Sequence, residues 1–311
     1  MIPSILWVLT ALPVSAQAGP CQVKVLVYDS LVAKDGLFPV LKSAFQKKEN
    51  CELVAQSVGD GGQLLARLQS SRTDADAVIG LDQSNLGLVR AKLHGQKATA
   101  YDQSPMVWVG NREEFEKRKL PIPKRILDLT TEPYQRQLLL QDPRGSTPGL
   151  IHLLFLSRKI TDSQQLRAFL KKIRTNVLAL TPGWSASYSL FKKNQAPMVW
   201  TYLSSVAYHR EKDGPAGEKY FPVYLDEGAP VQVEYAAVLK DSPKAQALIQ
   251  MLISAEIQAE IPKRNWMFPI KRDITLPESF SNLVQPKPLD NLEDTRLDLI
   301  RLLKIWEEAI R

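Results

Sequence analysis

Three short apolar runs separated by two amphipathic segments constrain the N-terminal part of this chain more than any other feature. The runs lie at 23–28, 53–58 and 77–81, and the segments between them lie at 37–48 and 63–70. Short β-branched runs are typical of buried strands, whereas apolar residues that recur every three or four positions are typical of helices. Because strand–helix–strand units adopt right-handed crossovers, this order predicts an α/β fold with a parallel sheet.

A second series of such patterns follows, and the length of 311 residues is itself typical of two domains. Extended runs are expected at 106–109, 138–141, 177–180 and 198–202, and helices at 150–158, 164–175 and 185–192. The β-rich run 231–239 leads back to the first sheet, and two further helices are expected at 244–261 and 294–310. We therefore expect two α/β lobes joined by two crossover strands, the first lobe comprising 19–106 and 231–311 and the second comprising 107–230.

The first 18 residues have the pattern of a secretory signal peptide. Residues 2–14 are largely apolar, and Ala16 and Ala18 place small side chains three residues and one residue before a cleavage point. No other stretch of the sequence approaches the length of a membrane span. We therefore expect a secreted protein.

Cys21 and Cys51 are the two cysteines, and each immediately precedes one of the first two predicted strands. If those strands are parallel neighbours, both sulfur atoms lie at the same end of the sheet. An oxidising compartment then favours a disulfide between them, and two buried free thiols are the alternative.

Charge and motif content argue against several classes of function. The net charge is +7, but the basic residues are scattered, so a solvated surface is favoured over a nucleic-acid site. His94, His152 and His209 have no further histidine or cysteine at the spacing of metal ligands. Trp184-Ser185 after Gly183 lacks the second glycine of a nucleophile elbow. We expect no catalytic residue, no metal and no cofactor.

Two predicted helix starts have the residues of an anion site. Asp60-Gly61 and Ser146-Thr147 each precede an apolar helical segment, where hydroxyl groups and free backbone N–H groups are suited to a phosphate or another polar group. Ordinary helix capping, with Asp60 as the N-cap of one helix and Pro148 in the first turn of the other, is the alternative. Both interpretations remain open at this point.

Four aromatic residues lie at turns or element ends and not within helical core stripes: Trp184, Tyr202, Tyr208 and Trp266. Aromatic side chains in such places often stack on a ligand, and a group of them suits a flat cationic heterocycle. Packing in the core is the alternative for each of them.

In combination and in order, several segments resemble the thiamine-binding periplasmic proteins of ABC transporters from about residue 23 to the C-terminal helix. These segments are Tyr28-Asp29-Ser30, Asp60-Gly61, Gly80-Leu81-Asp82, Gln141-Asp142-Pro143-Arg144, Ser146-Thr147-Pro148-Gly149-Leu150, Gly183-Trp184-Ser185 with Tyr188, Tyr202 with Ala207-Tyr208-His209, Gln232-Val233-Glu234, and Ile261-Pro262 with Asn265-Trp266-Met267. The resemblance implies the two-lobed fold of class II binding proteins. It further implies a monomer that binds thiamine, thiamine monophosphate or thiamine diphosphate between the lobes and delivers it to a membrane permease.

The resemblance also implies roles for individual residues. Trp184, Tyr202, Tyr208 and Trp266 would surround the thiamine rings with Tyr28 nearby, Asp60 would face the cationic part, and Gly61, Ser146 and Thr147 would lie near the hydroxyethyl or phosphate end. After Tyr28 the family carries a cleft tryptophan, and this chain has Asp35-Gly36-Leu37-Phe38 there, so Phe38 is the expected partial substitute.

Two other classes of function are compatible with this fold. Thiamine-cleaving enzymes resemble these proteins but use a cleft cysteine, whereas both cysteines here precede strands, away from the end where α/β sheets bind ligands. A binding protein for iron, a polyamine or another small solute is the other alternative. The tryptophan-rich set favours an organic cation.

Overall fold

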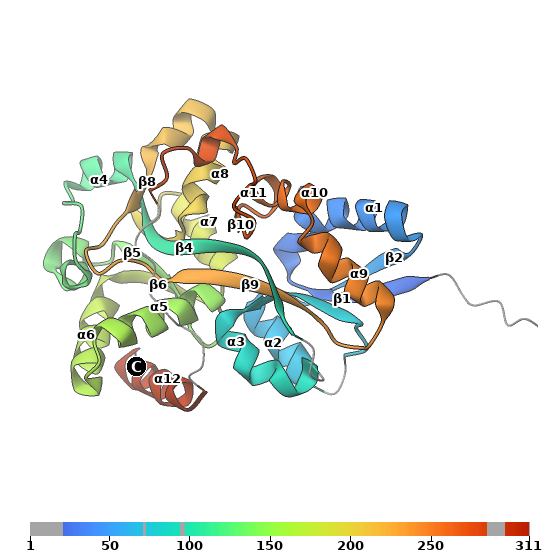
Figure 1. Cartoon of the computed structure of the whole chain (residues 1–311). Coiled ribbons are helices and arrows are strands. Elements are labelled where there is room, and N and C mark those ends of the chain that lie inside the picture. Colours follow the sequence, from blue (N-terminus) through green and yellow to red (C-terminus); the bar gives the residue numbers. More distant parts are fainter. Residues whose placement is uncertain (1–20, 71–72, 94–96, 285–295, 311) are drawn as a thin grey trace, which may run out of the picture.

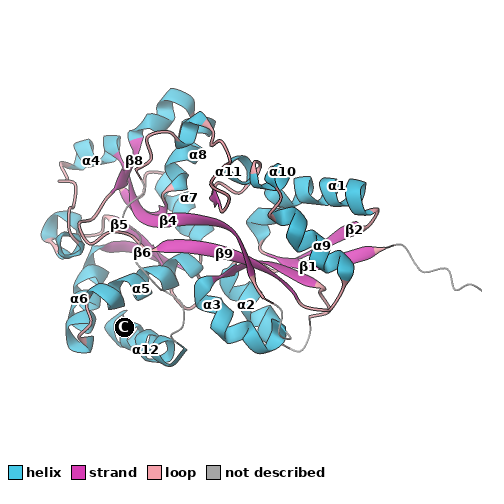
Figure 2. Ribbon diagram, viewed as in Figure 1, coloured by secondary structure: helices cyan, strands magenta, loops and turns pink. Residues whose placement is uncertain are grey.

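The computed structural model describes residues 21–70, 73–93, 97–284 and 296–310. The signal peptide expected at 1–18 lies outside these residues. Helices cover both faces of a ten-stranded mixed sheet with the order β2-β1-β3-β9-β4-β7-β5-β6, in which β8 and β10 also pair with β4 (Figure 2). Among the described residues, no helix has the length and apolar character needed to cross a membrane.

The first lobe follows the predicted order of strands and helices. It contains β1 (Gln22–Val27), α1 (Leu37–Glu49), β2 (Glu52–Ser57), α2 (Gly61–Gln69), β3 (Ala77–Asp82) and α3 (Gln83–Val89). Strand β1 pairs in parallel with both β2 and β3, and β9 (Val231–Val238) adds to β3 in the antiparallel sense. Cys21 and Cys51 precede the parallel neighbours β1 and β2, and the structure joins them in a disulfide.

A single long strand, β4 (Thr99–Asn111), belongs to both lobes. Its first half pairs with β9 up to Pro105, and from Met106 it pairs with β7 (Met198–Tyr202). In Figure 1, β4 and β9 lie side by side across the middle of the molecule. The sequence predicted a strand only at 106–109, because Asp102 and Ser104 look like loop residues although the structure buries both.

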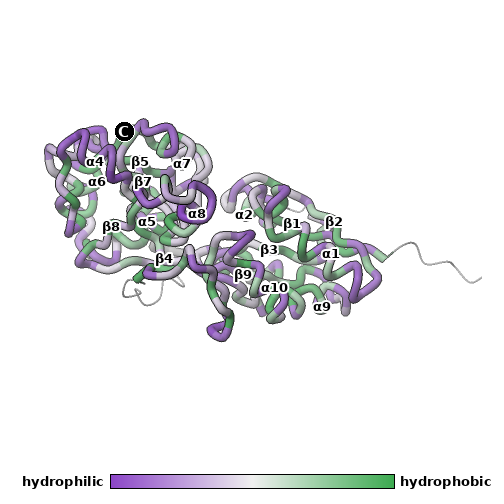
Figure 3. Tube along the Cα trace, turned by 90° about the horizontal axis from the view of Figure 1, so that it is seen from above, coloured by the Kyte–Doolittle hydropathy of each residue, from purple (hydrophilic) through white to green (hydrophobic). Residues whose placement is uncertain are grey.

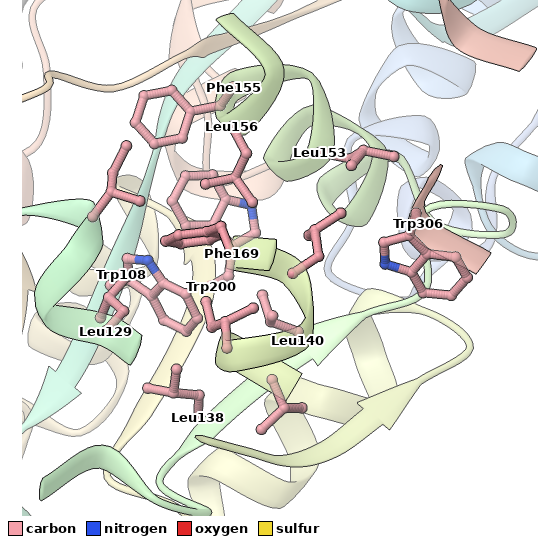
Figure 4. Packing of buried hydrophobic residues seen from close by; sticks show 14 of the residues in the cluster. Trp108, Leu129, Leu138, Leu140, Leu153, Phe155, Leu156, Phe169, Trp200 and Trp306 are labelled. Atoms are coloured by element: carbon pink, nitrogen blue, oxygen red, sulfur yellow. The ribbon is translucent and has the colours of Figure 1, made fainter. Parts of the chain in front are cut away.

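The second lobe has its own α/β core. Its elements are α4 (Arg112–Arg118), β5 (Leu138–Gln141), α5 (Thr147–Lys159), α6 (Ser163–Asn176), β6 (Val177–Thr181), α7 (Trp184–Lys192), β7, α8 (Ser204–Lys212) and β8 (Tyr220–Val223). Strand β5 is parallel to both β6 and β7. Helix α5 is buried from Thr147 to Leu156, and Phe155 stacks on Trp200 at 6.1 Å between ring centroids (Figure 4).

The helix expected at 244–261 is wrong, because the structure divides this segment into shorter helices. They are α9 (Pro243–Leu252), α10 (Ala255–Gln258) and α11 (Ile261–Arg264), and β10 (Phe268–Pro269) follows them. The side chain of Ser254 accepts a hydrogen bond from the N–H of Ile257 and so starts a new helix. Pro262 has no N–H to continue an earlier helix and lies in the first turn of α11.

The C-terminal helix, α12 (Arg296–Ile310), packs on the second lobe. The sequence had led us to expect it in the first lobe together with the rest of 231–311. Ile305 and Trp306 belong to the same buried cluster as α5 and α6 (Figure 4). Ion pairs join Arg167 to Glu308 at 2.8 Å and Arg144 to Glu307 at 3.5 Å. The apolar stripe of an amphipathic helix does not specify which lobe it covers.

Six short 3-10 helices complete the described elements: Asp29–Val32, Arg90–Leu93, Ile126–Thr130, Glu132–Tyr134, Gly214–Lys219 and Glu278–Phe280. Figure 3 shows the two lobes next to each other from above, with largely hydrophobic strands inside each lobe and more hydrophilic segments around them. The crossover strand β4 lies between the lobes in this view.

Candidate functional site

Three helix N-termini meet where the two lobes touch. Helix α2 of the first lobe starts at Gly61, and α5 and α7 of the second lobe start at Thr147 and Trp184. A Cβ atom on Gly61 would lie 2.5 Å from Thr147 Oγ1, and one on Gly183 would lie 2.6 Å from Asp60 Oδ2. Since a larger residue would displace the Thr147 and Asp60 side chains, glycine allows the lobes to contact each other directly.

The carboxylate of Asp60 connects two of these helix starts. Its Oδ1 accepts a hydrogen bond of 2.5 Å from the N–H of Gly61, and the Gln63 side chain caps the N–H of Asp60 in return. The backbone N–H of Trp184 is a further donor to Asp60. Burial raises the pKa of Asp60, and these two backbone hydrogen bonds oppose that rise. Backbone N–H groups thus already bind the carboxylate of Asp60, which was expected to face a ligand.

The start of α5 has a polar group without a partner. Ser146 is 2% exposed, and its Oγ has no hydrogen-bond partner within the described part of the chain. The neighbouring Thr147 Oγ1 donates a hydrogen bond of 2.9 Å to Asp82 Oδ2 in the first lobe. A buried hydroxyl group at an uncapped helix N-terminus has the chemistry required to bind an anion.

The four predicted aromatic residues form two groups. Trp184 stacks on Tyr188 with 4.8 Å between ring centroids, and Tyr202 lies at 6.0 Å from Trp184. Tyr208 meets Trp266 edge to face at 5.1 Å. Trp184 and Trp266 both pack against one hydrophobic cluster that includes Phe268 and Tyr188. The structure therefore brings these side chains to a common region.

Trp266 has an uncommon backbone conformation, with φ of +52°. A bulky L-residue in the left-handed region is strained, and such strain persists only where the surrounding structure imposes it. Its indole remains partly exposed and also lies 5.7 Å from the Lys212 ammonium group. The strained turn thus places a large aromatic surface at the edge of the site.

Tyr28 belongs to a buried acidic network next to Asn265, the residue that precedes Trp266. Its Oη lies 2.8 Å from Glu234 Oε2 and 3.1 Å from Asn265 Oδ1, and its ring covers Gly80. Tyr101 Oη donates to the same Glu234 oxygen at 2.5 Å. The φ of Gly80 is +106°, and a Cβ atom there would lie 2.3 Å from the Tyr28 ring, so the position requires glycine.

Asp102 and Glu234 lie opposite each other on the antiparallel strands β4 and β9. Asn265 Nδ2 donates to Asp102 Oδ2 at 2.7 Å, but Asp102 Oδ1 is buried without a hydrogen-bond partner among the described residues. Burial, and then repulsion from Glu234, raises the pKa of Asp102 well above its ordinary value. Burial likewise raises the pKa of Glu234, and hydrogen bonds from Tyr101 and Tyr28 oppose the rise.

Four carboxyl groups therefore lie in this region without a basic partner. In the part of the chain that the structure describes, Asp60, Asp82, Asp102 and Glu234 form no ion pair with lysine or arginine. Burial is the largest cause of the raised pKa in each of them. Buried acidic groups without a counter-ion favour a cationic ligand, since a cation would offset the cost of their charge.

Sequence reasoning did not assign a role to several of these residues. Three of them, Tyr188, Glu234 and Asp82, lie in segments that resemble the family, but the resemblance did not indicate what these residues do. Asp102 stands in no recognisable pattern, and only the strand register places it beside Glu234. Phe38 was expected to replace a cleft tryptophan, but this is wrong because its side chain is buried in the core of the first lobe.

The described residues contain no group of three or more histidine, cysteine or acidic side chains arranged to hold a metal ion. A cavity of about 20 Å³ lies beneath α12, between His152 and Trp306, and not between the lobes. The disulfide lies at the opposite end of the parallel strands from Tyr28, which follows β1, and from Asp82, the last residue of β3.

Comparison with known proteins now places the chain in a family. The model of the family described as bacterial extracellular solute-binding protein matches residues 32–264. The chain belongs to this family. This solute-binding protein thus has the two-lobed class II α/β fold that the resemblance implied.

The similar proteins cover nearly all of this solute-binding protein. The thiamine-binding periplasmic proteins of Brucella abortus (strain 9-941) and Escherichia coli (strain K12) are each 33% identical to it, over 97% and 91% of this chain and 94% and 90% of their own. A solved periplasmic thiamin binding protein has a TM-score of 0.80 at 29% identity, covering 93% of this chain and 96% of its own. The ferric binding protein of Campylobacter jejuni, at 14% identity and a TM-score of 0.73, shares the fold alone.

Proposed function

We propose that this solute-binding protein captures thiamine, or its monophosphate or diphosphate, between its lobes in the periplasm and delivers it to the permease of an ABC transporter. The observation that carries the proposal is the combination of four carboxyl groups without a basic partner, three of them buried, with two groups of aromatic side chains. Thiamine matches both features, because it joins a positively charged thiazolium ring to a flat aminopyrimidine. The names of the relatives support the same ligand.

The aromatic groups and the carboxyl groups have complementary tasks. Trp184, Tyr202, Tyr208 and Trp266 offer faces and edges for stacking and cation–π attraction. Glu234 and Asp102, with Tyr28 beside them, provide negative charge and an unpaired acceptor oxygen for the amino group. Asp60 acts indirectly, because protein donors already bind its carboxylate.

The phosphate or hydroxyethyl end of the ligand is assigned to the start of α5. The unpaired hydroxyl of Ser146 and the positive end of the helix suit a phosphate oxygen, and Gly61 and Thr147 bring the second helix start close to it. This assignment predicts that Ser146 contributes more to the binding affinity for the phosphorylated ligands than to the affinity for thiamine.

Closure of the lobes is the mechanism of capture. The contacts from Thr147 to Asp82 and from Asp60 to Trp184 connect one lobe to the other, so they favour a closed form. A ligand that touches both lobes stabilises this form by its differential contacts, and a permease would recognise it. We further propose that the protein acts as a monomer and releases thiamine unchanged, since its cysteines are joined in a disulfide remote from the site.

The test is a titration of the purified mature protein with thiamine, thiamine monophosphate and thiamine diphosphate, followed by intrinsic tryptophan fluorescence and calorimetry. We expect saturable binding with one ligand per protein and intact ligand on chromatography afterwards. Ferric iron and spermidine serve as comparison ligands. Tighter binding of either comparison ligand, or the appearance of free pyrimidine or thiazole, contradicts the proposal.

A further inference from the structure

A chain of hydrogen bonds leads from the candidate ligand-stacking residue Trp184 into the second lobe. The indole Nε1–H donates to Thr201 Oγ1 at 2.8 Å, and this hydroxyl lies 3.0 Å from Ser205 Oγ. Ser205 in turn forms a hydrogen bond with the hydroxyl of Tyr188. Tyr188 is also the residue whose ring stacks on the Trp184 indole, so the chain returns to its starting residue from another direction.

The chain continues from Tyr188 to the protein surface. Tyr188 Oη lies 2.8 Å from His209 Nε2, and His209 Nδ1 lies 2.6 Å from Asp213 Oδ2. His209 is 1% exposed and stacks on the Tyr220 ring at 3.6 Å, whereas the Asp213 side chain is 42% exposed. The network therefore begins at the site and ends at a solvated carboxylate.

The donors and acceptors along this chain have one consistent direction. An indole N–H only donates, so Thr201 Oγ1 accepts from Trp184. When the Thr201 proton is directed at Ser205 and the Ser205 proton at Tyr188, each hydroxyl accepts one hydrogen bond and donates the next. Tyr188 then donates to His209 Nε2, which leaves the proton on Nδ1 to bind Asp213. This arrangement requires a neutral His209, and burial favours it by lowering the pKa of the imidazole. Hydrogen bonds aligned in one direction reinforce one another.

We infer that His209 and Asp213 are positioning residues, which hold the Trp184 indole in the orientation needed to stack on the ligand through Tyr188, Ser205 and Thr201. The inference rests on the proposed function for its ligand but not for the network itself. Neither His209 nor Asp213 was assigned a role by the pattern of the sequence. Their effect on binding is indirect, since Tyr188 stands between them and the indole.

The network is tested first without ligand, by the indole ¹⁵N–¹H resonances of the mature protein, with the Trp184 signal assigned from Trp184→Phe. Tyr188→Phe keeps the stacked ring but breaks the chain, and Asp213→Asn weakens its end. We expect both changes to move the Trp184 indole proton upfield and to leave the signals of Trp108 and Trp306 in place. Glu211→Gln, the same change of charge at an exposed position on α8, is the matched control and should move none of them. An unchanged Trp184 signal in both variants would overturn the network.

Affinity for thiamine, measured by calorimetry, tests the positioning role. We expect Tyr188→Phe and His209→Leu to weaken binding about three- to tenfold, the effect of losing an ordinary hydrogen bond. His209→Gln retains an acceptor for Tyr188 and should recover most of that loss, whereas a merely structural histidine would not be replaced in this way. Full affinity in Tyr188→Phe and His209→Leu would overturn positioning. If the wild-type protein does not bind thiamine, the proposed function fails, and the indole signals still decide whether the network exists.

Discussion

The hydroxyl of Thr147 donates a hydrogen bond to the buried carboxylate of Asp82, and this contact joins the start of α5 in the second lobe to the end of β3 in the first. Asp82 also accepts hydrogen bonds from Ser84 and Asn85 within its own lobe. The bond from Thr147 therefore requires the two lobes to be in contact, whereas the others lie within the first lobe. Closure can thus be weakened without changing the fold of either lobe.

Thr147→Val removes that hydroxyl at nearly constant volume. We expect the affinity for thiamine to fall about tenfold, close to the lower limit for the loss of a hydrogen bond to a charged group, because contact between the lobes becomes less favourable. Calorimetry measures the affinity, and small-angle scattering should show a more open ligand-free protein. Thr147→Ser keeps the hydroxyl and is the control. Equal affinities of the valine variant and the wild type would show that the Thr147–Asp82 hydrogen bond does not contribute to binding.

Trp266→Ala tests the aromatic site. Its indole is partly exposed and strained, so we expect a loss of about 1–3 kcal/mol of binding free energy from stacking and cation–π attraction. Thermal unfolding should change much less than for Trp306→Ala, since Trp306 is buried in the core beneath α12. If Trp266→Ala instead unfolds the protein while the folded fraction binds normally, Trp266 is a core residue.

Ser146→Ala separates the phosphorylated ligands from thiamine. The hydroxyl is buried without a partner, so its removal should leave the stability of the ligand-free protein unchanged or slightly increased. We expect weaker binding of thiamine monophosphate and diphosphate and a smaller effect on thiamine, measured by parallel titrations. An equal loss of affinity for all three ligands would contradict the assignment of Ser146 to the phosphate and would leave the proposed thiamine site unaffected.

The acidic pair makes binding depend on pH. Because burial raises the pKa values of Asp102 and Glu234, these groups take up protons at a higher pH than exposed carboxyls do. Protonation removes the charge that attracts a cation, so the affinity for thiamine should fall as the pH is lowered through the raised pKa. Binding should release protons, which calorimetry in buffers of different ionisation enthalpy detects.

The same pair has the opposite effect on folding. A carboxyl group whose pKa is raised by folding binds a proton more readily in the folded than in the unfolded state. Its cost to stability is therefore greatest at neutral pH and disappears as the pH falls below the pKa of the group in the unfolded state. Glu234→Gln should therefore raise the melting temperature of the empty protein at pH 7, weaken thiamine binding and flatten its pH profile. Glu116→Gln, at an exposed position, is the control. A lower melting temperature in Glu234→Gln would contradict this account.

The disulfide should contribute to stability and not to binding. A loop with a sequence separation of 30 between Cys21 and Cys51 corresponds to about 3–4 kcal/mol in the chain-entropy model. We expect the Cys21→Ser/Cys51→Ser variant to unfold at lower denaturant concentration and to bind thiamine with unchanged affinity. Reaction of both cysteines with a maleimide in the unfolded, unreduced protein would show that no bridge forms.

Local pattern predicted those elements whose ends are marked by neighbouring residues. The strands Leu138–Gln141 and Met198–Tyr202 have the bounds expected from the sequence. Gln137 and Asp142-Pro143 flank the first run, and Pro197 precedes the second. The segment 244–261 keeps its apolar pattern across Ser254, so periodicity alone did not reveal the break. The aromatic residues were visible as well, since no helical stripe accounts for Trp184 or Trp266.

Tertiary structure decided what depends on contacts between distant segments. The register of β4 against β9 places Asp102 opposite Glu234, and closure of the lobes gives Asp60 its second partner at Trp184. The position of α12 was also decided in this way. Its apolar face could cover either lobe, and in the structure it packs on the second. Hydrophobic periodicity records which face of an element is buried, but it carries no information about the partner that buries it, and register, closure and docking are properties of that partner.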